Sequence, residues 1–123
     1  MNTQHGSPGR TWFVDIDGTV FLHAGYRGAP DVPVSGVRAF LAGLPPQDVV
    51  VLTTARLPEQ QPETEEALRR EGIRWDRILY GLPPGPRILV NDRLPGDAQT
   101  AFALNVERNR PWSDLARKIG AEG

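Results

Sequence analysis

The sequence contains no cysteine. Disulfide bonds, thiolate zinc sites and a cysteine nucleophile are therefore excluded. It also has no apolar run of about 20 residues, the length that a membrane-spanning helix needs. The first ten residues are polar and lack the apolar segment of a secretory signal. We therefore expect a cytoplasmic protein without membrane contact, in which residues 1–10 form a flexible tail.

The sequence also lacks an excess of charge of either sign, since it has 14 basic and 15 acidic residues. Without a basic patch, nucleic-acid binding is not indicated, although it stays open. No Gly-x-Gly-x-x-Gly follows the first apolar run, which argues against a dinucleotide-binding domain. A Gly-rich phosphate loop ending in Lys-Ser/Thr is also missing, which argues against a P-loop kinase. The 123 residues fit a single domain, which we place at residues 11–120.

Short apolar runs are present, separated by clusters of the 12 prolines and 13 glycines. The runs typical of strands are residues 12–16, 49–53, 77–80, 87–91 and 101–106. Helical spacing of apolar residues occurs at 34–44, 63–71 and 112–119. This alternation predicts an α/β fold, a three-layer Rossmann-like sandwich with a mainly parallel sheet of about five strands.

Polar residues follow three of the predicted strands. They are Asp15 and Asp17 after the first strand, Thr53, Thr54 and Arg56 after the second, and Asn91, Asp92 and Arg93 after the fourth. In open α/β sheets the site lies beyond the carboxyl ends of the strands. We therefore expect these groups to converge on one site.

Asp15 and Asp17 are two carboxylates that can approach one cavity where the chain turns at Gly18. Both stay ionised only if a cation compensates them, and Mg²⁺ prefers such oxygen ligands. Asp92 can complete the metal site. A carboxylate beside Mg²⁺ can attack phosphorus, while a second one transfers protons. Thr54 and an arginine can bind phosphoryl oxygens.

Each of these residues also has a plainer interpretation. Asp, Gly and Thr are turn residues, so the segment from Asp15 to Thr19 can be an ordinary turn. Thr54 can cap a turn, Arg56 can be a solvated side chain, and Asp92 can begin a loop. Their joint occurrence at strand ends favours a functional site over these separate explanations.

With these motifs the sequence resembles the haloacid dehalogenase-like superfamily, over residues 12–110. The motif Asp15-Ile16-Asp17-Gly18-Thr19 after an apolar strand carries most of the resemblance. It implies that Asp15 is the nucleophile and that Asp17 is the general acid/base. It also implies that Asp15, the backbone carbonyl of Asp17 and Asp92 bind Mg²⁺. Residues 88–92, which end in Asn91-Asp92, resemble the fourth motif of the superfamily. Asp97 has a spacing that fits the second acid of that fourth motif, and equally fits a loop residue.

The second motif of the superfamily resembles residues 49–56, which end in Thr53-Thr54-Ala55-Arg56. The resemblance implies a phosphate site, which we place at Gly18, Thr54, Ala55, Arg56 and Arg87, with Thr53 as the alternative to Thr54. The lysine that usually precedes the fourth strand is missing, because the only lysine is Lys118. Arg87 is the nearest substitute, and Arg56, Arg74 and Arg77 are others.

The connections are too short for a cap domain, so the resemblance implies a capless, open site. Such a site suits a large substrate or closure by a second subunit of a homo-oligomer. We therefore expect a Mg²⁺-dependent phosphatase that acts through an aspartyl-phosphate on a small-molecule or polymer-end phosphomonoester. The alternative is a phosphate-binding or regulatory module with little or no turnover, which the missing lysine motivates.

Overall fold

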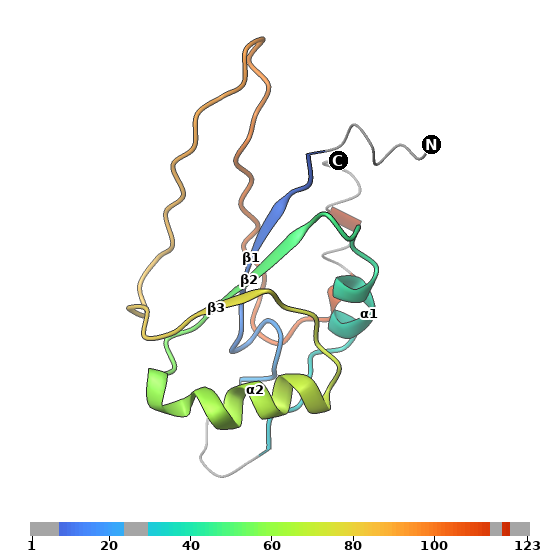
Figure 1. Cartoon of the computed structure of the whole chain (residues 1–123), viewed down its shortest axis with the longest axis vertical. Coiled ribbons are helices and arrows are strands. Elements are labelled where there is room, and N and C mark those ends of the chain that lie inside the picture. Colours follow the sequence, from blue (N-terminus) through green and yellow to red (C-terminus); the bar gives the residue numbers. More distant parts are fainter. Residues whose placement is uncertain (1–7, 24–29, 114–116, 119–123) are drawn as a thin grey trace.

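The computed structural model describes residues 8–23, 30–113 and 117–118. At its centre lies a parallel sheet of three strands, β1 (Thr11–Asp15), β2 (Val49–Thr53) and β3 (Arg77–Leu79), in the order β1-β2-β3 (Figure 1). All three agree within one residue with strands predicted from the sequence. The strands are in register from Thr11 beside Val49 to Asp15 beside Thr53, so β1 and β2 end together.

Two helices connect these strands, α1 (Val37–Ala42) and α2 (Gln61–Arg70), the latter preceded by the 3₁₀ turn η2 (Pro58–Gln60). Parallel strands joined in sequence by right-handed crossovers place their helices on the same face of the sheet. Leu41 of α1 and Leu68 of α2 accordingly share one buried cluster with Val14 and Leu52 of the strands. Both helices were predicted, and α1 is shorter than expected at each end.

The opposite face of the sheet is mostly exposed within the described residues, although Val51 and Thr53 of β2, which point to it, are buried. Phe13 of β1 is 56% exposed there, and Val49 and Leu79 are also exposed. The described chain is thus an α/β fold with one helical layer on a three-stranded sheet. The expected five strands and third layer are not present in it.

Residues 83–107, which we call the arm, differ from the prediction. Neither 87–91 nor 101–106 forms a strand, and Figure 1 shows the arm as a long extension leaving the sheet and returning to it. Its turn is closed by an isolated bridge between Leu94 and Ala98. Ile88 and Val90 are 86% and 88% exposed. Their β-branched pattern predicted a strand, but an isolated pair of extended segments gains too little to form a ladder.

The chain rejoins the body at Asn109, whose backbone N–H donates to the carbonyl of Gly18 at 2.8 Å. Trp112 then buries its ring beside Phe40, with 5.0 Å between ring centroids, and its indole N–H donates to the carbonyl of Thr19. Trp112 and Ser113 begin the predicted last helix. Leu115 and Ile119, on which that prediction also rested, lie outside the described residues.

The amino-terminal end of β1 is fastened to the start of β2. The buried Asp48 carboxylate accepts hydrogen bonds from the backbone N–H of Arg10, at 2.9 Å, and from the indole of Trp12, at 3.0 Å. Arg10 therefore belongs to the folded domain, while residues 1–7 of the predicted tail lie outside the described part. No described helix has the length and apolar character needed to cross a membrane.

Candidate functional site

The candidate site begins where β1 ends at Asp15. The carbonyl of Ile16 accepts hydrogen bonds from the N–H groups of Thr19, Val20 and Phe21, which curls the chain into a tight loop. Gly18 lies in this loop with a φ of 91°, a conformation that favours glycine. A Cβ at Gly18 would also stand 3.2 Å from the Arg108 side chain. The loop therefore requires the glycine of the Asp-x-Asp-Gly-Thr motif.

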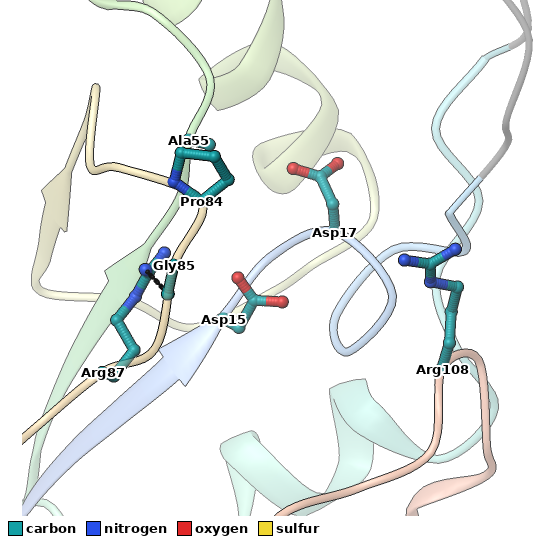
Figure 2. A pocket seen from close by; sticks show the side chains of 7 residues that line it. All are labelled: Asp15, Asp17, Ala55, Pro84, Gly85, Arg87 and Arg108. Atoms are coloured by element: carbon teal, nitrogen blue, oxygen red, sulfur yellow. Dashed lines mark hydrogen bonds between the residues drawn. The ribbon is translucent and has the colours of Figure 1, made fainter.

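Beside this loop lies a cavity of about 350 Å³ (Figure 2). It combines two carboxylates with two guanidinium groups and the backbone of the segment that enters the arm. The lining residues are Asp15, Asp17, Ala55, Pro84, Gly85, Arg87 and Arg108. Four of the predicted site residues, Asp15, Asp17, Ala55 and Arg87, are thus brought to one cavity.

Asp15 borders the cavity with a carboxylate whose pKa is raised. Partial burial is the main cause, and the nearby charge of Asp17 adds to it. A hydrogen bond from the Thr19 hydroxyl at 3.4 Å and the charge of Arg87 lower the pKa, but by less. The Asp15 carboxylate is therefore under-compensated, and a bound cation would stabilise its ionised form.

Asp17 is held from the other side by Arg56. The Arg56 guanidinium donates to Asp17 Oδ1 at 2.8 Å and to Asp31 Oδ1 at the same distance. It also donates to the buried hydroxyl of Thr64 on α2. Burial lowers the pKa of Arg56, but these bonds, first to Asp31 and then to Asp17, raise it above its ordinary value. Arg56 is therefore a permanently charged clamp between two acids.

Thr54 links this clamp to the end of β2. Its buried hydroxyl donates to Asp17 Oδ2 at 3.2 Å and accepts the backbone N–H of Arg56 at 2.9 Å. Thr53 is the last residue of β2 and makes no such contact to Asp17 among the described interactions. The geometry associates Thr54, rather than Thr53, with Asp17.

The remaining predicted cations lie elsewhere or are engaged. Arg87 borders the cavity while its Nη1 donates to the carbonyls of Pro83 and Gly85. Arg74 is structural, because it donates to carbonyls that include Leu44 and Asp48 near the start of β2.

Arg77 is the first residue of β3 and lies at the end of that strand away from the cavity. Lys118 is described as helical, and the cavity lining does not include it.

Asp92 is not brought to the cavity, because it lies on the exposed arm. Within the described residues no three acidic, histidine or cysteine side chains are grouped closely enough to hold a metal ion. Asp97 forms part of the arm's turn, with a φ of 67° and its N–H bonded to the carbonyl of Leu94. This is the conformation of a loop residue.

Sequence reasoning missed Asp31 and Arg108. Asp31 follows Pro30 in a Pro- and Gly-rich stretch, where an aspartate is ordinarily a turn residue. Arg108 follows the arm and reaches the cavity only because Asn109 is bonded to Gly18. Neither residue has a spacing that would have identified it, since both positions depend on how distant loops pack.

Comparison with known proteins gives no match: no family model, no curated protein and no solved structure matches the chain. The function is therefore argued from the residues of the site.

Proposed function

We propose that the chain is a Mg²⁺-dependent phosphomonoester hydrolase with Asp15 as its nucleophile. One observation carries the proposal: Asp15 and Asp17 open onto a single cavity with Arg87 and Arg108, at the carboxyl end of a parallel sheet. The arginines suit a phosphoryl group, which two guanidinium forks can bind through its oxygens. The carboxylates suit nucleophilic attack and proton transfer.

The residues fit a magnesium ion in a limited way. Asp15 supplies a carboxylate whose pKa is raised by burial and then by the charge of Asp17, and the backbone carbonyl of Asp17 would be a second oxygen ligand. Mg²⁺ commonly keeps several waters and binds through only one or two carboxylates. Bound there, it would offset the negative charge of carboxylates and phosphoryl oxygens.

In the proposed reaction an Asp15 carboxylate oxygen forms a bond to phosphorus as the bond to the ester oxygen breaks. Asp17, when protonated, gives its proton to the leaving oxygen. Asp17 then accepts a proton from a water molecule, which attacks phosphorus, releases phosphate and restores Asp15. For this proton transfer, Asp17 must first release its hydrogen bonds from Arg56. Arg56 keeps its hydrogen bonds to Asp31 and can then orient substrate.

The larger sheet expected from the sequence belongs to the same proposal. If residues 87–91 and 101–106 joined the sheet, it would have five strands. Asp92 would then follow a strand at the carboxylate-bearing edge, where it would be a third oxygen ligand. Cytoplasmic location and a small-molecule or polymer-end substrate remain part of the proposal.

The test is hydrolysis of an aryl phosphate with Mg²⁺, comparing the wild type with Asp15→Asn. We expect kcat to fall by at least about a thousandfold, because the nucleophile is removed. Glu66→Gln is the matched control, since it also neutralises one exposed carboxylate but lies on α2 outside the cavity. Equal activity of wild type and Asp15→Asn would remove the assigned nucleophile.

A phosphate-binding module with little turnover is the second candidate. It is favoured by the Arg56 clamp, which engages the carboxylate assigned to proton transfer. Calorimetric titration with inorganic phosphate and Mg²⁺ distinguishes the two. Binding without hydrolysis of any of a broad panel of phosphomonoesters would establish the module, whereas binding with turnover supports the hydrolase.

A further inference from the structure

The arm exposes a large apolar surface. Its exposed large side chains include Ile88, Leu89, Val90, Phe102, Leu104 and Val106. They lie on both legs of the arm, and their exposed fractions range from 38% to 88%. This concentration of exposed apolar side chains in one segment marks an interaction site rather than ordinary scatter of single apolar residues.

The outer edge of β1 is a complementary surface. Arg10 and Ile16 direct backbone groups at β2, since the Arg10 carbonyl accepts from Val49 N–H at 2.9 Å and Ile16 N–H donates to the Thr53 carbonyl at 3.0 Å. In a parallel pair alternate residues point the other way, so the N–H and C=O of Phe13 face outward. Among the described strands, only β2 pairs with β1. An edge of this kind is a template for another strand.

The length and anchoring of the arm let it reach a neighbouring molecule. Its two ends are held at the site, by Leu82 N–H on the carbonyl of Thr54 at 3.1 Å and by Asn109 N–H on the carbonyl of Gly18. Residues 87–91 begin five residues beyond Leu82, a span of about 17 Å when extended, which is about the length of β1. In the single chain the turn of the arm lies beyond the end of the sheet (Figure 1).

A second copy of this chain fits both surfaces. It supplies one arm for each free edge, so that an exchange closes with two-fold symmetry and leaves neither unpaired.

The charges of the arm and of the β1 edge also agree with a second copy of the chain as the partner. Arg93 follows the proposed strand and would lie at the end of β1 that carries the Asp15 carboxylate in the other copy.

We propose that two copies of the chain exchange arms, with residues 87–91 of each copy adding a strand to the outer edge of β1 in the other. The dimer stands independently of the proposed function. One consequence rests on that function: Asp92 follows the exchanged strand, so each site combines the Asp15 of one copy with the Asp92 of the other.

The first experiment measures mass by light scattering during gel filtration at micromolar concentration. We expect the wild type to have twice the chain mass of 13.6 kDa. Phe13→Pro removes the outward N–H and should give a monomer, because proline is tolerated on an edge strand but cannot donate there. Phe13→Val is the matched control, keeps the N–H and should remain a dimer. Circular dichroism confirms that each variant is folded.

A monomeric wild type overturns the proposal, as does a folded Phe13→Pro dimer. If Phe13→Pro does not fold, the double variant Ile88→Lys with Val90→Lys decides instead. Both side chains are exposed in the single chain, so charging them leaves the core intact. The double variant should be monomeric, and a dimer of unchanged stability would overturn the exchange.

The second experiment mixes Asp15→Asn with Asp92→Asn chains after partial unfolding and refolding. Random pairing gives mixed dimers in which one of two sites is intact, so about a quarter of wild-type activity should return. No recovery from two variants of an active wild type overturns the shared site. An inactive wild type that is still an arm-dependent dimer overturns the proposed function while supporting the exchange.

Discussion

The body, which is the sheet with its two helices, and the arm both contain apolar runs. These runs are buried in the body and exposed in the arm. Val50 and Leu52 of β2 are fully buried, whereas Ile88 and Val90 in a similar apolar run of the arm are almost fully exposed. β2 has a neighbour on each side and two helices against one face. The comparison shows that an apolar run becomes a strand only where other elements satisfy its backbone and cover its side chains.

The site spans both regions. The body contributes Asp15 and Asp17, together with the Thr54 and Arg56 contacts that orient Asp17. The arm contributes Arg87 at its base, next to the cavity. A site that joins a rigid body to an uncovered segment is complete only when that segment is held in place.

The largest difference between the two regions should appear in core truncations. Leu52→Ala should lower the free energy of unfolding by about 2–5 kcal/mol, because it leaves a cavity in the buried cluster. Val90→Ala should change it by less than about 0.5 kcal/mol in the monomeric Phe13→Pro background. Urea unfolding followed by circular dichroism measures both. Equal losses would show that the arm is packed in the monomer.

A smaller effect on stability is expected from removing the Asp48 carboxylate. Asp48→Ala should cost about 2–3 kcal/mol, because it leaves the Trp12 indole and the Arg10 N–H without their acceptor. Asp92→Ala on the arm is the comparison and should be near neutral. Burial raises the pKa of Asp48, but the bonds from Trp12 and Arg10 outweigh it and lower the pKa.

The sign of the pH dependence follows from that lowered pKa. The stabilisation by Asp48 is present above the ordinary carboxyl pKa of 3.8 and is lost as the pH falls through the lowered value. Thermal unfolding of wild type and Asp48→Ala between pH 7 and pH 3 tests this. A difference in Tm that stayed constant down to pH 3 would contradict the assigned hydrogen bonds.

The smallest expected effect is an increase in stability, on replacing Asp15. Because burial and then Asp17 raise the pKa of Asp15, its ionised form is less favourable in the folded state. Without Mg²⁺, Asp15→Asn should therefore raise Tm at pH 7, by less than the Asp48 effect. The gain should shrink as the pH falls toward 3.8, where the wild-type carboxyl is protonated. A lower Tm for Asp15→Asn at pH 7 would contradict this.

The sequence predicted the strands and helices of the body because their apolar periodicity is local. Residues 49–53 were placed correctly from a β-branched run, and the turn at Gly18 from its glycine. The same reasoning placed strands at 87–91 and 101–106, where the described chain has none. Local pattern records the preference for a strand, whereas pairing requires a neighbour that local pattern does not identify.

By itself, the sequence determined that two carboxylates follow a buried strand and that a threonine and an arginine follow the next. Only the tertiary structure decided how they meet, with Arg56 clamped between Asp17 and Asp31, and Arg108 brought to the cavity. The reason is physical: strand ends follow from short-range periodicity, but ion pairs depend on where separate loops pack. The position of the arm, and of Asp92 on it, depends on the burial available to it.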